Sequence, residues 1–205
     1  MNVFVTGGSR GIGRAIALRF ARDGATRVAI GYLRNDRAAE ETAEEIRAAG
    51  AEPVLVRGNV TSTRVLAEVG SLGELDVLVH NAATGVVRGA LETTDKHWDW
   101  TVNANARALL QLARVVVPQM PGGSSIVAIS SLGAQRVMEN YSLIGTSKAA
   151  LESLVRYLAV ELAPRGIRVN AVSGGVVAFL SGPDADMIRG QTIIVDGGFS
   201  LLVGG

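Results

Sequence analysis

Short apolar runs alternate along this chain with segments that carry apolar residues at helical spacing. The apolar runs are rich in β-branched residues and predict strands, which lie at residues 2–6, 27–33, 53–57, 75–80, 124–130, 167–173 and 192–195. The helical patterns lie at residues 12–23, 37–49, 63–69, 101–119 and 141–162. Strands this apolar must be covered on both faces, as in a parallel sheet flanked by helices. The pattern predicts one α/β domain over residues 1–205 with a doubly wound parallel sheet.

The composition narrows the class of protein. The 205 residues carry a formal net charge of +1, which provides no field to attract nucleic acid. Because there is no cysteine and only two histidines are present, His80 and His97, neither disulfides nor a metal site are expected. No apolar stretch is long enough to cross a bilayer, and the chain opens directly on the first apolar run. We expect a cytoplasmic protein that binds neither nucleic acid nor a membrane.

The first predicted strand leads into a glycine-rich turn that the first helix follows directly. The turn reads TGGSRGIG over residues 6–13. Its glycines allow a sharp turn, a close approach to a pyrophosphate and tight helix packing, while the helix N-terminus attracts the anion. The spacing therefore predicts a Rossmann-type dinucleotide site. Its candidate cofactor-binding residues are Gly7, Ser9, Arg10, Gly11, Ile12 and Gly13.

The segment after the second strand bears on the choice of cofactor. An acidic residue there would bind the ribose of NAD, but this chain has Arg34 and Asn35, and Arg10 lies in the glycine turn. Guanidinium groups suit the extra phosphate of NADP, so we expect NADPH. The alternative is that Arg34 is a solvated loop residue and that either cofactor binds. Further candidates follow the third and fourth strands, at the edge where such sheets bind ligands: Asn59, Val60, Asn81, Ala82 and Ala83.

Tyr141 and Lys148 stand seven positions apart at the start of the last long helix. Seven residues make nearly two helical turns, which places both side chains on one face of the helix. A nearby ammonium favours the phenolate and lowers the pKa of a phenol from its usual value of about 10. The pair therefore predicts a tyrosine that can act as an acid near neutral pH.

Together these motifs resemble the short-chain dehydrogenase/reductase family over essentially the whole chain. The resemblance rests on the glycine turn, HNAA at residues 80–83, the VNANA segment, AISS ending at Ser131, the tyrosine and lysine pair, and GQTIIVDGG at residues 190–198. It implies hydride transfer from a nicotinamide, with Tyr141 as the proton donor. It also implies that Lys148 binds the nicotinamide ribose, that Ser131 orients the substrate oxygen and that an asparagine supports a water relay.

Two of these assignments leave a choice between neighbours. Asn103 and Asn105 both lie in VNANA, and we favour Asn103, although either could be a helix amide bonded to the backbone. Ser131 is favoured over Ser130, which falls in a predicted strand. The alternative for Ser131 is a turn hydroxyl that caps a loop.

The tyrosine spacing departs from that of most family members, which place three residues between tyrosine and lysine. The position four before Lys148 is Ile144, which has no proton to donate. The longer spacing resembles the enoyl-acyl-carrier-protein reductase branch, and ENYSLIGTSKAALESL resembles its NADPH-dependent type III enzymes, FabL. The implied function is reduction of the 2,3-double bond of an enoyl thioester of acyl-carrier-protein or CoA in fatty-acid biosynthesis. The alternatives are a 3-oxoacyl or general carbonyl reductase and a non-catalytic NADP-binding scaffold or sensor.

The segment after the sixth strand is shorter than the family pattern. Relatives continue there into a substrate lid of one or two helices, whereas this chain runs from SGGVV, which contains the candidate cofactor residue Gly174, directly to AFL. The lid is absent between Val177 and Ala178. Either the protein has lost it or the sequence omits a mobile segment, and we favour omission. The C-terminal IIVDGG resembles the part that assembles family tetramers, so a homo-oligomer, a dimer or tetramer, is expected.

Overall fold

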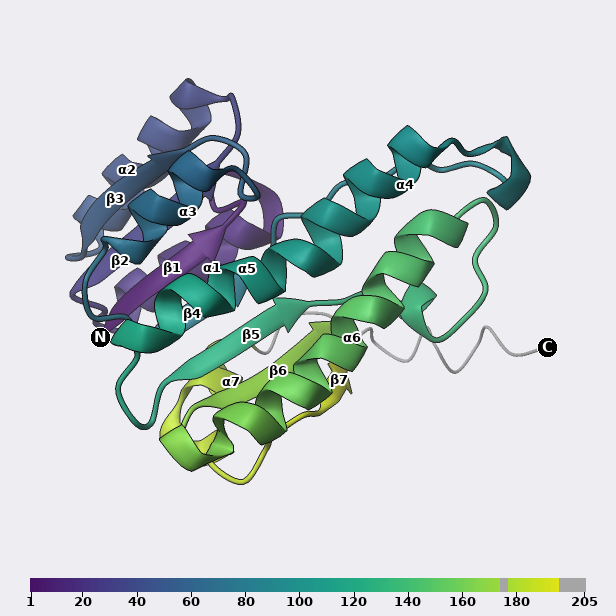
Figure 1. Cartoon of the computed structure of the whole chain (residues 1–205). Coiled ribbons are helices and arrows are strands. Elements are labelled where there is room, and N and C mark those ends of the chain that lie inside the picture. Colours follow the sequence, from purple (N-terminus) through teal and green to yellow (C-terminus); the bar gives the residue numbers. More distant parts are fainter. Residues whose placement is uncertain (174–176, 196–205) are drawn as a thin grey trace.

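Seven parallel strands form one sheet with helices on both faces (Figure 1). The computed structural model describes residues 1–173 and 177–195. The strands are β1 (Asn2–Thr6), β2 (Arg27–Tyr32), β3 (Glu52–Arg57), β4 (Val77–His80), β5 (Ser125–Ile129), β6 (Arg168–Ser173) and β7 (Thr192–Ile194). Their order is β3-β2-β1-β4-β5-β6-β7, which reverses direction at β1 and β4. The predicted Rossmann-type, doubly wound sheet is confirmed.

The strands send alternate side chains into two separate cores. In β1, Phe4 packs into one core while Val3 and Val5 pack into the other, and all three are at most 1% exposed. Both cores are covered by helices, which explains why the strands read as continuous apolar runs. The Phe4 core holds side chains of α3 (Thr63–Gly70), α5 (Ala108–Val116) and α6 (Ser142–Leu162), and the opposite core holds those of α1 (Gly11–Arg22), α2 (Asp36–Ala48) and α7 (Val177–Ser181).

The helix predicted at residues 101–119 begins too late in the chain. It begins earlier, as α4 (Asp95–Val102), continues through a π-helical turn (Asn103–Arg107) into α5, and ends in a 3-10 turn (Val117–Gln119). Thr94 starts α4 with a capping box in which its hydroxyl accepts from the His97 amide. The pattern missed α4 because only Thr101 is buried in it, so it carries no apolar stripe. The short α7 was not predicted either.

The parallel register brings the ends of several strands to one edge of the sheet. Thr6, the last residue of β1, pairs with Gly31 of β2, and β4 pairs with both β1 and β5. The glycine turn after β1, Asn81 after β4 and Ser131 after β5 therefore all leave the sheet at the same edge. Ligands bind at this edge in open α/β sheets.

Within the described residues, no helix is long and apolar enough to span a bilayer, and no cluster of three acidic or histidine side chains could hold a metal ion.

Candidate active site

The glycine turn after β1 leaves no room for a side chain at Gly7, Gly8 or Gly13. Gly7 and Gly11 have φ angles of 66° and 55°, a region that other residues rarely adopt. A Cβ on Gly13 would lie 2.2 Å from the Gly7 carbonyl oxygen and 2.5 Å from Asn81 Nδ2. The turn can close only with glycine at position 13, which agrees with the close helix packing expected from the sequence.

Two side chains from the sheet hold this turn in place. The Thr6 hydroxyl oxygen accepts from the backbone amides of Asn81 and Ala82, each at 2.9 Å. In return, the Asn81 amide nitrogen donates to the carbonyl oxygens of Thr6 at 3.0 Å and of Gly7 at 3.2 Å. Asn81 therefore supports the turn through its side chain, whatever else it contacts when a ligand is present.

The N-terminus of α1 fits the pyrophosphate of a dinucleotide. Arg10 occupies the N-cap position without a capping side-chain bond, and the first turn has no acidic residue. The first amides of the helix therefore keep their donors for an anion, at the positive end of the helix dipole. Ser9 is buried, whereas Arg10, Gly11 and Ile12 are exposed beside this terminus. These residues can hold the phosphate groups of NADPH or NADH.

The other predicted cofactor residues differ in whether their side chains already form ion pairs or hydrogen bonds within the protein. Within residues 1–173 and 177–195, the side chains of Arg10 and Arg34 form no ion pair, and both are exposed. The Asn35 side chain caps α2 by accepting from the Ala38 amide at 3.1 Å. The Asn59 side chain accepts from the amide and hydroxyl of Thr61, each at 3.0 Å, and so closes a local turn. Val60 packs partly against the Phe4 core, Ala83 is exposed, and Gly174 lies outside the described residues.

Tyr141 and Ser131 meet at the start of α6. The Tyr141 hydroxyl lies 3.4 Å from the Ser131 hydroxyl. Two glycines make this approach possible, because a Cβ on Gly133 would lie 2.6 Å from the Tyr141 ring and one on Gly145 would lie 2.5 Å from the Gly133 carbonyl oxygen. The turn after β5 can therefore lie directly on α6 and the tyrosine ring.

Lys148 is buried on the same helix. Its side chain is only 4% exposed, and its ammonium donates to the carbonyl oxygen of Ile129, at the end of β5, over 2.6 Å. Burial disfavours the charged form and lowers the pKa of Lys148 to about 8.

The structure separates the two asparagine candidates. Asn105 is fully buried, and its side chain bonds the backbone of Thr84 through both amide atoms at 2.8 Å and the Ser147 hydroxyl of α6 at 2.8 Å. Asn103 instead accepts from the Arg107 side chain at 3.3 Å. The preference for Asn103 stays a prediction. The geometry brings Asn105 next to the helix that carries Tyr141 and Lys148.

Ile144 occupies the position where most relatives were expected to carry the tyrosine. It packs against Gly85, where an added Cβ would lie 2.3 Å from the Ile144 side chain. The site is thus filled by an aliphatic group at position 144, and the phenol stands one turn nearer the start of the helix. Sequence reasoning recognised the shift in spacing but not the role of Gly85.

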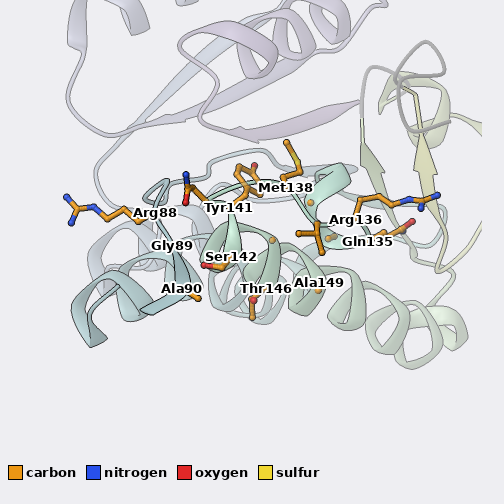
Figure 2. Close-up of a pocket in the computed structure, with 15 residues that line it drawn as sticks. Arg88, Gly89, Ala90, Gln135, Arg136, Met138, Tyr141, Ser142, Thr146 and Ala149 are labelled. Carbon is orange, nitrogen blue, oxygen red and sulfur yellow. The ribbon is translucent and has the colours of Figure 1, made fainter. Parts of the chain in front are cut away.

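A cavity of about 430 Å³ opens beside Tyr141 (Figure 2). On one side lie Tyr141, Ser142 and Thr146 at the start of α6, and on the other lies the turn that follows Ser131. The remaining wall comes from residues 88–90. The cavity adjoins the tyrosine rather than the glycine turn, so it is the candidate space for a substrate.

Comparison with known proteins decides the family. Residues 7–178 match the sequence family described as enoyl-(acyl carrier protein) reductase. The chain is also 32% identical to dehydrogenase/reductase SDR family member 4 of Sus scrofa, over 95% of this chain and 85% of that protein. The chain belongs to the short-chain dehydrogenase/reductase (SDR) family of oxidoreductases.

Other reductases resemble this SDR as strongly. A 1-cyclohexenylcarbonyl-CoA reductase of Streptomyces collinus is 36% identical, over 97% of this chain and 86% of that enzyme. The landomycin C-6 ketoreductase LanV, solved with bound NADP and rabelomycin, superposes with a TM-score of 0.91 at 30% identity, over 98% of this chain and 96% of LanV. The alignment with the S. collinus enzyme runs over 242 positions although this SDR has 205 residues, so that enzyme carries residues with no counterpart here.

Proposed function

We propose that this SDR reduces the 2,3-double bond of an enoyl thioester with NADPH, as an enoyl-acyl-carrier-protein reductase of fatty-acid biosynthesis or a related enzyme acting on CoA thioesters. The observation that carries the proposal is the place of the phenol. Tyr141, next to Ser131 and the cavity, has the hydroxyl, whereas Ile144 fills the position nearer Lys148. The enoyl reductase family match and the CoA thioester substrate named for the S. collinus relative support the same reading.

The shifted phenol suits an enolate better than an alkoxide. In a ketone reduction, negative charge develops on the oxygen of the carbon that receives the hydride. In an enoyl reduction, it develops on the thioester oxygen, which lies farther from the β-carbon that receives the hydride. A donor moved along the helix can meet that oxygen, since stabilisation must be placed where charge develops.

Each candidate residue then has a separate role in the proposed reaction. The N-terminus of α1 would hold NADPH, which would supply the hydride for the β-carbon. The Tyr141 hydroxyl donates to the thioester oxygen and stabilises or protonates the enolate, and the Ser131 hydroxyl, 3.4 Å from the Tyr141 hydroxyl, orients that oxygen. Lys148, buried on the same helix, would bind the nicotinamide ribose. Asn105 takes the asparagine role, because it is the buried amide that contacts α6.

NADPH rather than NADH is proposed from the arginines near the end of β2. Arg10 and Arg34 are exposed, and Asp36, the acidic residue nearest in sequence, pairs with Arg57 at 3.1 Å. A 2′-phosphate would therefore meet guanidinium groups, whereas the hydroxyls of NADH would find no free carboxylate there. LanV, with bound NADP, is consistent with this choice. Arg34→Glu should lower the preference for NADPH over NADH in KM without changing which substrate is reduced.

A ketone reductase is the second candidate, because the structurally similar LanV is a ketoreductase. NADPH consumption with crotonyl-CoA and acetoacetyl-CoA, followed side by side with the same enzyme preparation, separates the two. We expect turnover of the crotonyl thioester to dominate. Exclusive turnover of the ketone would reverse the assignment. NADPH binding without oxidation in either assay would favour a non-catalytic scaffold or sensor.

We further propose that the substrate lid is omitted from this sequence rather than lost by the protein. The longer alignment with the S. collinus enzyme and the end of the family match at residue 178 both support missing residues near Val177 and Ala178. The residues after this point pack back on β6, since Arg168 donates to the carbonyl oxygens of Leu180 and Gly182. An intact mass of the natural protein near 21.3 kDa would reject omission.

A homo-oligomer is proposed from the exposed apolar residues of two regions. Trp98 and Trp100 of α4 are 46% and 53% exposed, and Tyr157 and Val160 of α6, which packs beside α4, are 68% and 76% exposed. β7 is an edge strand of the sheet, and its last residue, Ile194, is 38% exposed, which favours pairing with a second copy. Sedimentation should give a dimer or tetramer.

The cytoplasmic location stays a prediction from the sequence.

A further inference from the structure

His80 lies between the two halves of the site and contacts both. It ends β4, is fully buried, and was singled out in the sequence only as part of HNAA. Its Nε2 lies 3.0 Å from the carbonyl oxygen of Asn105, and its Nδ1 lies 3.4 Å from the Thr6 hydroxyl. The ring thus touches the residue that holds the glycine turn and the residue proposed for the asparagine role.

The contacts fix the proton on one ring nitrogen. A carbonyl oxygen can only accept, so Nε2 carries the hydrogen and donates to Asn105. Nδ1 is then an acceptor, and the Thr6 hydroxyl has one hydrogen to share between Nδ1 and the Val79 carbonyl oxygen, each at 3.4 Å. Burial, together with the charge of Lys148, lowers the pKa of His80 to about 4, so the ring is neutral near pH 7.

Each ring nitrogen faces a different function. On the Nδ1 side, the Thr6 oxygen also accepts from the amides of Asn81 and Ala82, and these contacts shape the cofactor turn. On the Nε2 side, the Asn105 carbonyl belongs to the π-helical turn, and the Asn105 side chain bonds Ser147, the neighbour of Lys148. The ring therefore contacts both hydrogen-bond networks, the one around Thr6 and the one around Asn105, whose residues are far apart in the sequence.

We propose that His80 is a positioning residue whose Nδ1 supports the cofactor turn through Thr6 and whose Nε2 supports the catalytic helix through Asn105. This inference rests on the proposed function, because it assigns turnover to the Asn105 side. Its consequence is that cofactor binding and catalysis can be weakened separately by removing one ring nitrogen at a time.

Two conservative variants make this separation. The Oδ1 atom of an asparagine stands about where Nδ1 stands, so His80→Asn keeps an acceptor for Thr6 but loses the donor to Asn105. The Nε2 atom of a glutamine stands about where the ring Nε2 stands, so His80→Gln keeps that donor and weakens the contact with Thr6. We expect His80→Asn to bind NADPH within about twofold of the natural protein and to turn over about tenfold more slowly. We expect His80→Gln to show the reverse pattern.

The readouts are the Kd for NADPH, measured by its fluorescence, and kcat with crotonyl-CoA. A merely structural role predicts that both variants lose affinity and rate in parallel with their melting temperatures, and that result would overturn the proposal. Values for both variants within about twofold of the natural protein would overturn it as well. If the natural protein reduces neither thioester, the proposed function fails, but the expected difference between the two variants in NADPH affinity still tests the Thr6 contact.

A measurement on the unmodified ring covers the case in which the variants do not fold. The chain has two histidines, so the imidazole ¹⁵N spectrum can be assigned with His97→Asn. We expect His80 to give the signals of a neutral ring with its hydrogen on Nε2 at pH 7. A hydrogen on Nδ1, or a charged ring, would contradict the proposed contacts.

Discussion

The cofactor side and the substrate side of this site both depend on glycines, but the glycines face different neighbours. On the cofactor side, Gly13 faces the Gly7 carbonyl oxygen and the amide of Asn81. On the substrate side, Gly133 faces the ring of Tyr141. Backbone atoms within a closed turn cannot move aside, whereas an aromatic ring at the mouth of a cavity can turn or shift. The first glycine therefore controls whether a ligand site exists, and the second controls where one side chain points.

The two sides also differ in how many bonds hold them. The glycine turn is held by bonds from Thr6 and Asn81, which are themselves anchored in the sheet. Among residues 1–173 and 177–195, the Tyr141 hydroxyl has one hydrogen-bond partner, the Ser131 hydroxyl at 3.4 Å. Damage to the cofactor side should therefore appear as lost binding and stability, and damage to the substrate side as lost rate.

The largest effect is expected from Gly13→Ala. The new methyl group would lie 2.2 Å from the Gly7 carbonyl oxygen, so the turn must open. We expect a loss of about 3 kcal/mol in the free energy of unfolding and of about 100-fold in NADPH affinity. Urea denaturation and fluorescence titration measure the two quantities. Gly70→Ala is the matched control, because its Cβ would lie an ordinary 3.6 Å from Val115, and it should change neither.

Lys148, which is buried beside the end of β5, gives a prediction for pH. Its pKa is about 8 in the folded protein and near 10.5 when unfolded, so between these values the unfolded chain holds a proton that the folded chain lacks. The free energy of unfolding therefore contains a contribution that rises with pH from 8 to 10.5, by up to about 3 kcal/mol. Lys148→Met should remove this rise, as seen by urea denaturation across that range.

The control for this experiment is the other lysine of the chain. Lys96 is exposed, so Lys96→Met should keep the pH dependence of the natural protein. Equal slopes for the natural protein and Lys148→Met would show that Lys148 is not buried in the way described. The tyrosines and arginines are common to all three proteins, so their titration cancels in the comparison.

A smaller effect is expected from Gly133→Ala on the substrate side. Its Cβ would lie 2.6 Å from the Tyr141 ring, which must shift away from Ser131. We expect kcat with crotonyl-CoA to fall about tenfold while the Kd for NADPH stays unchanged. Gly89→Ala lies in the wall of the same cavity with its nearest contact at 3.6 Å, and it should leave kcat close to that of the natural protein. A loss of NADPH binding in Gly133→Ala would remove the contrast between the two sides.

The cofactor side was the easier of the two to predict from the sequence. For every strand and for four of the five helices, both predicted ends lie within two residues of the observed ends. Apolar periodicity predicts these elements well because it reflects burial directly. The glycine turn is likewise a local feature, in which Gly7, Gly11 and Gly13 meet requirements set by their own neighbours.

The parts that were missed depend on contacts or on helix phase. Residues 103 and 105 point in different directions on any helix, and the π-helical turn changes the phase that decides which one faces the site. No sequence pattern reveals that turn, so the choice between Asn103 and Asn105 stays a prediction. His80 contacts Thr6 and Asn105, which are 74 and 25 positions away in the sequence. Ile144 and Gly85, which pack against each other, are also far apart in the sequence. Such pairs become visible only in the folded structure.

The central claim is that the phenol at position 141 is the acid of the reaction, and Tyr141→Phe tests it most directly. The substitution removes one hydroxyl whose neighbour is Ser131 and leaves the ring in place. In a single turnover with bound NADPH and crotonyl-CoA, we expect the rate of NADPH oxidation to fall at least about 100-fold, with the Kd for NADPH within about twofold of the natural protein. An unchanged rate of NADPH oxidation in Tyr141→Phe would contradict the claim.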